Sequence, residues 1–172
     1  INVAGGTTTI LPNGNFGPIY ETEEFTEDIW ISGLPRLHID VSTATVGGQI
    51  YALLEDCSEE GNCIHIGNAI MDLRYHEGGN QEQTWLPIFE TINAKMEFFA
   101  MDVQIQAGHT IRLSLASTGE DYLPASTSSI VEVSESSSSN LFLDIIHPEE
   151  KLLFDPPRCT HQSCLDWLNQ TV

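Results

Sequence analysis

Positive charge is nearly absent from this sequence. Only six of the 172 residues are lysine or arginine, against 25 aspartates and glutamates, which gives a formal net charge of −19 at neutral pH. Such a chain repels the phosphate backbones of DNA and RNA, so nucleic acids are excluded as partners. We expect the carboxylates to form a solvated surface.

Long apolar runs and metal-binding motifs are also missing. No stretch approaches the roughly 20 apolar residues that a membrane-spanning helix needs, so we expect a soluble chain without a membrane span. No Asp-x-Asp-x-Asp-Gly loop is present to gather oxygen ligands for Ca²⁺. We therefore predict neither a metal site nor a cofactor.

A serine nucleophile in a hydrolase context is missing as well. No Gly-x-Ser-x-Gly motif occurs, and the six histidines are scattered along the chain away from any nucleophile motif. His109 follows Ala107-Gly108 and is interpreted as a turn residue. We therefore predict no catalytic residue in this chain.

The four cysteines fall into two close pairs, Cys57 with Cys63 and Cys159 with Cys164. Each pair flanks a short polar loop, which favours two local disulfides and an oxidising, extracellular compartment. A zinc site built from all four cysteines has the wrong spacing for the usual motifs but stays open as an alternative, as does crossed pairing.

Apolar and polar side chains alternate through residues 29–56, a period of two that is typical of half-buried strands. The apolar positions are Leu37, Ile39 and Val41 before the turn at residues 46–48, and Ile50, Ala52 and Leu54 after it. Similar runs occur near residues 64–75, 94–105, 111–115, 130–134 and 141–145. Eight or nine strands with almost no helix predict an all-β fold, a jelly-roll β-sandwich of two antiparallel sheets with long loops, similar to galactose-binding domains.

Composition divides the chain into three parts. Residues 1–24 are rich in Gly, Pro, Thr and Asn and are expected to form a linker or an edge segment. Residues 25–157 carry the strand patterns and are expected to form the sandwich. Residues 158–172 are a tail with the second cysteine pair.

One loop segment, residues 85–89, is unusually apolar. We interpret it either as a plug over one end of the sandwich or as a contact surface for a neighbouring domain. The candidate contact residues are Trp85, Leu86 and Phe89, together with Trp167 in the tail.

Three stretches carry a resemblance to a known family. They are FTEDIWISGLPRLHIDVSTATVGGQIYALLED from Phe25, IHIGNAIMDLRYHEG from Ile64 and AMDVQIQAGHTIRLSLAST from Ala100. In this order they resemble the C-terminal, non-catalytic domain of the X-Pro dipeptidyl-peptidase and cocaine-esterase-like (CocE/NonD) serine hydrolases. The likeness covers roughly Phe25 to Pro157.

The resemblance implies an accessory domain without activity of its own, in a secreted hydrolase whose catalytic α/β-hydrolase domain lies upstream. It would pack on that domain and help to shape the active-site entrance. A different class of function is a free-standing carbohydrate-binding module with an aromatic platform, for which Trp30, Trp85 and Trp167 are the candidates.

Overall fold

The structure is a computed structural model that describes residues 7–77, 83–119, 122–124 and 129–147. Within these ranges the chain forms twelve strands and one turn of 3-10 helix, and none of its helices is long and apolar enough to cross a bilayer. The strands are β1 (Thr7–Ile10), β2 (Ile19–Glu21), β3 (Ile29–Gly33), β4 (Arg36–Thr43), β5 (Gln49–Cys57), β6 (Cys63–Asp72), β7 (Ile92–Glu97), β8 (Met101–Ile105), β9 (Thr110–Ala116), β10 (Val131–Ser134), β11 (Asn140–Phe142) and β12 (Ile145–Ile146), and the 3-10 turn η1 is Leu73–Tyr75.

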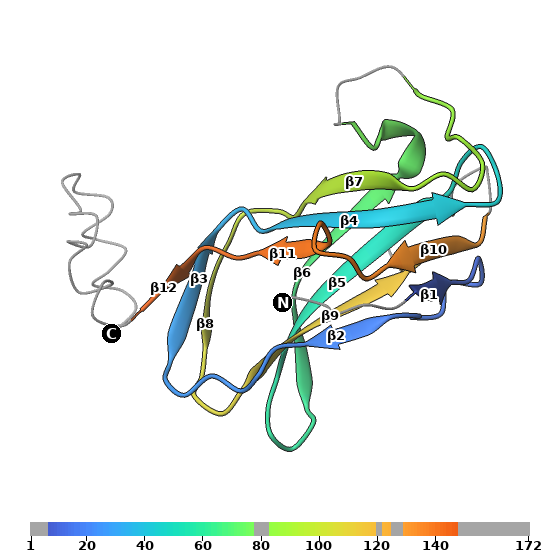
Figure 1. Cartoon of the computed structure of the whole chain (residues 1–172). Helices are drawn as coiled ribbons and strands as arrows, with labels where there is room; N and C mark the ends of the chain where they lie inside the picture. Colours follow the sequence, from blue (N-terminus) through green and yellow to red (C-terminus); the bar gives the residue numbers. More distant parts are fainter. Residues whose placement is uncertain (1–6, 78–82, 120–121, 125–128, 148–172) are drawn as a thin grey trace, which may run out of the picture.

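The strands form two packed layers (Figure 1). One layer is a four-stranded sheet in the order β2-β9-β5-β6. The other combines the sheet β1-β10-β4-β11, in which β7 also pairs with β4, and the sheet β12-β3-β8. Every strand pair is antiparallel, which confirms the predicted all-β antiparallel fold, whereas the jelly-roll subtype stays a prediction.

The second layer is continuous but bent. β3 runs into β4 with only Leu34 and Pro35 between them, and their partners β8 and β7 are separated only by residues 98–100. A backbone hydrogen bond from the amide of Phe98 to the carbonyl of Pro35 (3.0 Å) spans the interruption. Because proline has no N–H to donate, the ladder is broken at this point and the layer changes direction.

The hydrophobic core lies between the layers and follows the predicted alternation. The inward positions of β4 are Leu37, Ile39 and Val41, and those of β5 are Ile50, Ala52 and Leu54; all six are buried. The outward positions of β4 are polar. Further core residues come from the other strands, among them Ala94, Met96, Ile111, Leu113, Leu115, Val131, Val133 and Leu141.

A β-bulge occurs in β6, where the sequence shows a change of parity. Leu54 pairs with Gly67 and the next residue, Glu55, pairs with His65, so Ile66 is the extra residue on β6. A Cβ at Gly67 would lie 2.5 Å from the terminal methyl of Met101, so a larger residue there would have to displace that flexible side chain. Gly67 therefore leaves room beside the bulge for the Met101 side chain of β8.

The segment 1–24 and the two cysteine pairs can be compared with the structure where it describes them. Within residues 1–24, β1 pairs with β10 and β2 pairs with β9, so both are edge strands of the two sheets. The predicted disulfide between Cys57 and Cys63 is present and closes the β5–β6 hairpin. Cys159, Cys164 and Trp167 lie outside the described residues.

Candidate functional site

Exposed apolar side chains belong to loops that meet at one end of the sandwich. These loops lie at the right of the ribbon in Figure 1. We call this surface the apolar end. Its members, all exposed, are Leu11, Val46, Trp85, Ile88, Phe89, Leu123 and Ile130. They amount to seven of the fourteen exposed large hydrophobic residues in the described part of the chain.

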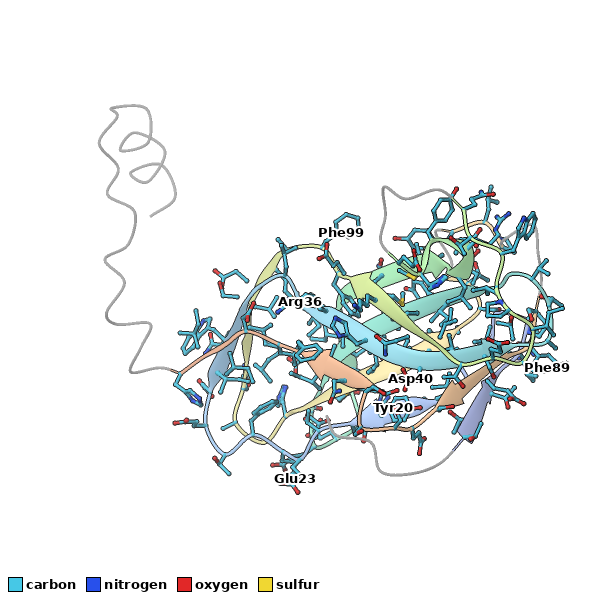
Figure 2. All side chains as sticks on the ribbon, turned by 45° about the horizontal axis from the view of Figure 1, so that its top comes forward. Tyr20, Glu23, Arg36, Asp40, Phe89 and Phe99 are labelled. Atoms are coloured by element: carbon cyan, nitrogen blue, oxygen red, sulfur yellow. A yellow bond between two sulfur atoms is a disulfide. The ribbon has the colours of Figure 1, made fainter. Side chains whose placement is uncertain are left out.

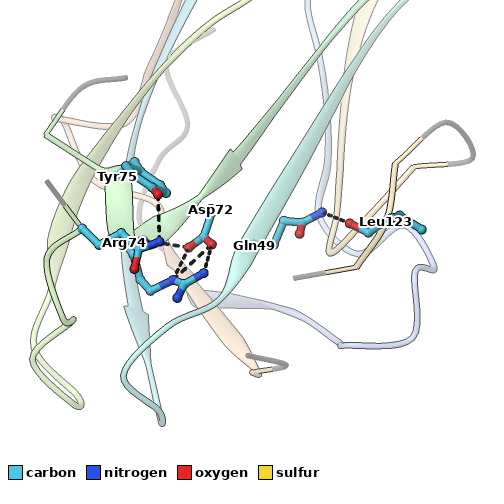
Figure 3. Close-up of polar contacts among 6 residues, drawn as sticks. Gln49, Asp72, Arg74, Tyr75 and Leu123 are labelled. Atoms are coloured by element: carbon cyan, nitrogen blue, oxygen red, sulfur yellow. Dashed lines mark hydrogen bonds and ion pairs between the residues drawn. The ribbon is translucent and has the colours of Figure 1, made fainter. Parts of the chain in front are cut away.

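Strand register brings these residues together from distant parts of the sequence. Val131 pairs with Ile10 on one side and with Thr43 on the other, so the residues just beyond these pairs, Leu11 and Ile130, lie beside the β4–β5 loop. The side-chain amide of Gln49 donates to the carbonyl of Leu123 at 3.4 Å, at the start of β5 (Figure 3). The end of β4, the end of β1 and the starts of β5 and β10 thus share one end of the fold.

The segment 83–91 is fastened to this end by its backbone. The amide of Leu86 donates to the carbonyl of Val46 (3.2 Å), and the amide of Phe89 donates to the carbonyl of Thr43 (2.9 Å). Leu86 itself is buried in the core at 4% exposure, whereas Trp85 is 63% exposed. One side chain therefore anchors the segment while its neighbours face outward.

Phe89 is in an unfavourable state in two respects. Its side chain is 75% exposed, and its backbone has a φ of 61°, in the left-handed region (Figure 2). It is the only non-glycine residue with a positive φ in the described ranges. A side chain in this region costs roughly 1–2 kcal/mol, and residues in such strained conformations cluster at functional sites.

A charged pair supports the start of the same segment. Asp72 caps the turn η1 by accepting a hydrogen bond from the amide of Arg74 (3.0 Å), and its carboxylate also pairs with the Arg74 guanidinium (Figure 3). Burial raises the pKa of Asp72, but the hydrogen bonds and charge of Arg74 outweigh it and hold the pKa below its ordinary value. The carbonyl of Arg74 accepts from the amide of Thr84 (2.8 Å), which connects this pair to the segment.

The residues predicted for a domain contact have different environments. Trp85 and Phe89 present exposed side chains, Leu86 points into the core, and Trp167 lies outside the described residues. Sequence inspection did not identify Leu11, Val46, Leu123 and Ile130, because they lie far apart in the sequence and none stands in a conspicuous apolar loop segment. Only the strand register, which is long-range information, could have found them.

No catalytic arrangement is visible in the described ranges. His109 is hydrogen-bonded to Asp56, its Nδ1 lying 2.7 Å from the carboxylate Oδ1, but no serine, threonine or cysteine in these ranges bonds to the other ring nitrogen. Groups of three or more His, Cys, Asp or Glu side chains able to hold a metal ion are also lacking among these residues. The turn interpretation of His109 agrees with a backbone hydrogen bond from its amide to Gln106 (3.1 Å).

Comparison with solved structures finds the same fold in hydrolases of low sequence identity. A CocE/NonD family hydrolase from Staphylococcus aureus is 11% identical, with a TM-score of 0.72 over 85% of this chain and 34% of its own. An aminopeptidase from a marine sediment archaeon (Thaumarchaeota archaeon) is 12% identical, with a TM-score of 0.69 over 86% of this chain and 34% of its own. An alpha-amino acid ester hydrolase is 19% identical, with a TM-score of 0.62 over 74% of this chain and 25% of its own.

The chain thus spans about a third or less of the length of these hydrolases. None of the curated proteins compared with the sequence matches it. A family model does match, over residues 13–144, and describes the X-Pro dipeptidyl-peptidase C-terminal non-catalytic domain. This match covers most of the chain and includes every strand from β2 to β11, and on this basis the chain belongs to the family of X-Pro dipeptidyl-peptidase C-terminal non-catalytic domains.

Proposed function

We propose that this chain is the accessory domain of a secreted serine hydrolase and docks through its apolar end on the catalytic α/β-hydrolase domain of its own parent chain. In that position the segment 83–91 and the β4–β5 loop line part of the active-site entrance. The hydrolysis itself takes place on the catalytic domain, and this chain contributes no reacting group. The substrates are peptides with an X-Pro sequence or small esters and amides.

The observation that carries this proposal is the exposure of Trp85 and Phe89 on an anchored segment. Monomeric surfaces seldom gather large apolar side chains, and where they do the patch marks an interaction site. Full burial of a large apolar side chain is worth about 1.5–3 kcal/mol, so these two rings alone supply a useful part of a docking free energy. The strained backbone of Phe89 fits the same role, because residues held in such conformations cluster at functional sites.

The family supports the choice of partner. The matching family model is a non-catalytic domain of a peptidase, and the structural neighbours are longer hydrolases of which this chain covers 34%. The disulfide between Cys57 and Cys63 supports a secreted protein, because disulfides persist mainly in oxidising compartments.

The test compares four samples: the parent hydrolase, its Trp85→Ala/Phe89→Ala variant, its Phe99→Ala variant and this chain alone. Phe99 is the control because it is 76% exposed and lies at the bend of the second layer, between β7 and β8 and away from the apolar end (Figure 2). Turnover of an aminoacyl-prolyl chromogen and of a simple ester chromogen is measured, and calorimetry follows the unfolding of each domain.

We expect the Trp85→Ala/Phe89→Ala variant to lose turnover and to unfold in two separate transitions, because the domains no longer stabilise each other. The Phe99→Ala variant should behave as the parent, and this chain alone should be inactive. Unchanged turnover and a single transition in the double variant would exclude docking through the apolar end.

A further inference from the structure

A groove of about 610 Å³ lies on the outer face of the sheet β2-β9-β5-β6. Its floor is formed by Tyr51 and Leu53, which point away from the core because their neighbours Ile50, Ala52 and Leu54 point into it. Small-molecule sites in proteins have volumes of roughly 300–1,000 Å³, so the groove is of suitable size for a ligand.

Two loops form the walls of the groove and are tied to each other. The amide of Gly14, in the β1–β2 loop, donates to the hydroxyl of Ser117 (3.1 Å), and the amide of Gly17 donates to the carbonyl of Leu115 (2.7 Å). Gly119 lies directly against the Tyr51 ring, where a Cβ would approach ring atoms to 2.6 Å. The described walls are therefore shaped before any ligand arrives.

The described lining combines aromatic surface with uncharged polar groups. Phe16, at the rim, is 47% exposed, and its ring centroid lies 6.3 Å from that of Tyr51. Asn13, Asn15 and His65 also line the groove, and Asn15 is exposed. The ring Nε2 of His65 is held by the side-chain amide of Asn68 at 3.2 Å.

Charge narrows the class of ligand. The described lining contains no aspartate, glutamate, lysine or arginine, although the chain carries 25 acidic residues. An anion would meet a strongly negative protein without a basic partner among the described lining residues. Recognition by these residues then depends on ring faces and on uncharged hydrogen-bonding groups. The groove thus favours a neutral ligand that has both apolar faces and hydrogen-bonding groups.

We propose that this groove binds a neutral saccharide. A sugar ring offers C–H faces for the exposed ring of Phe16 and hydroxyl groups for the amide side chains of Asn13 and Asn15. This activity goes beyond the docking role and does not depend on it, since it uses a sheet face and loops other than the segment 83–91. Binding of a saccharide in the groove would hold the protein near glycan-bearing material.

The experiment titrates the full chain with neutral tetrasaccharides (cello-, xylo-, malto- and N-acetylchito-oligomers), with tetragalacturonate and with a proline-rich peptide. Binding is followed by calorimetry and by amide chemical shifts. We expect a neutral tetrasaccharide to bind and to shift the amides of residues 13–17 and 117–119. Phe16→Ala should weaken that binding about tenfold, the loss expected when the apolar burial of one aromatic ring is removed.

Asn15→Ala tests the polar side of the site with an exposed residue whose removal leaves the fold intact, and it should also weaken binding. Phe99→Ala, on the other layer, should leave binding unchanged. The proposal would be overturned if no neutral tetrasaccharide bound, or if tetragalacturonate or the peptide bound more tightly. It would also be overturned if the Phe16→Ala and Asn15→Ala variants bound the saccharide as tightly as the unaltered chain. The docking proposal is tested at Trp85 and Phe89, so the two can fail separately.

Discussion

The imidazole Nδ1 of His109 lies 2.7 Å from the carboxylate of Asp56, and this contact joins the turn before β9 to the last residues of β5. The register brings them together, since Asp56 pairs with Ile111 and Cys57 pairs with Thr110. Both side chains are largely buried. The contact therefore fastens the end of the sandwich opposite the apolar end.

We predict that His109→Ala lowers the free energy of unfolding by about 1.5 kcal/mol, because a hydrogen bond to a charged group in a partly buried site is lost. Glu27→Ala is the control, since the ion pair of Glu27 with His147 is half exposed and should be worth less than about 1 kcal/mol. Urea denaturation of the three proteins gives the comparison. Equal losses in the two variants would contradict a special role for His109.

The stability of the fold should depend on pH through the carboxyl group of Asp40. Burial raises the pKa of its carboxyl, but hydrogen bonds from the hydroxyls of Ser136 and Ser138 and from the side-chain amide of Asn93 outweigh it and hold the pKa below the ordinary 3.8. The ionised form is therefore favoured by folding. Its contribution to stability is complete above the ordinary pKa and is lost as the pH falls through the lowered folded-state value.

We expect the Ser136→Ala/Ser138→Ala variant to have a higher pKa at Asp40 and a smaller loss of stability between about pH 4 and about pH 2. Carbon-detected NMR titration of the Asp40 carboxyl measures the first quantity, and thermal unfolding measured across this pH range gives the second. Ser42→Ala serves as the control, because the Ser42 hydroxyl bonds to Glu132 instead. A pKa at Asp40 that is unaltered in the double variant would show that the serines do not hold the charge.

Phe89→Gly should stabilise the chain by itself while weakening its docking. Glycine adopts a positive φ without the steric cost that Phe89 carries, so the melting temperature should rise, by an amount that corresponds to about 1 kcal/mol. Phe99→Gly removes an equally exposed ring where φ is not positive, and it should lower the melting temperature. Differential scanning calorimetry distinguishes the two, and a fall in both variants would mean that the Phe89 backbone is not strained.

We expect the disulfide to make a modest contribution to the free energy of unfolding. The bond between Cys57 and Cys63 closes a short hairpin loop, so the entropy model gives it a value of about 2 kcal/mol. The Cys57→Ala/Cys63→Ala variant should therefore unfold at lower urea concentration but keep its fold. Peptide mapping without reductant also tests the predicted Cys159–Cys164 pair, for which free thiols, or a bond from either cysteine to Cys57 or Cys63, would be the contrary result.

The strands of the core were predictable because their signal is local. The alternation of Leu37, Ile39 and Val41 reports directly which face is buried, and the change of parity near Gly67 reports the bulge. Phe99 shows the limit of this reasoning. It continues the apolar alternation of β8, yet the ladder is interrupted beside Pro35 and its ring is exposed.

The candidate site was predictable only in part, for the same reason. Trp85 and Phe89 stand in one conspicuous apolar run, whereas Leu11 and Ile130 reach the same surface only because β1 pairs with β10. The roles of Asp56 and Asp40 were equally hidden among 25 acidic residues, since each depends on partners more than 50 positions away. Pairing between strands that are distant in the sequence determines which of these residues come together, and local secondary-structure propensity does not contain that information.

The pairing of β4 also sets an order in time. β4 forms ladders with β10 and β11 along one edge, and these two strands lie about 90 to 105 residues further along the chain. At a synthesis rate of about 5–20 residues per second, that edge of β4 stays unpaired for an interval on the order of 5–20 s while the ribosome completes the domain. During this time β1 has no strand to pair with, because its sole partner in the described sheets is β10. The ladders of β4 with β10 and β11 therefore form last. Until then the unpaired edge of β4 is accessible to a chaperone or to a neighbouring domain.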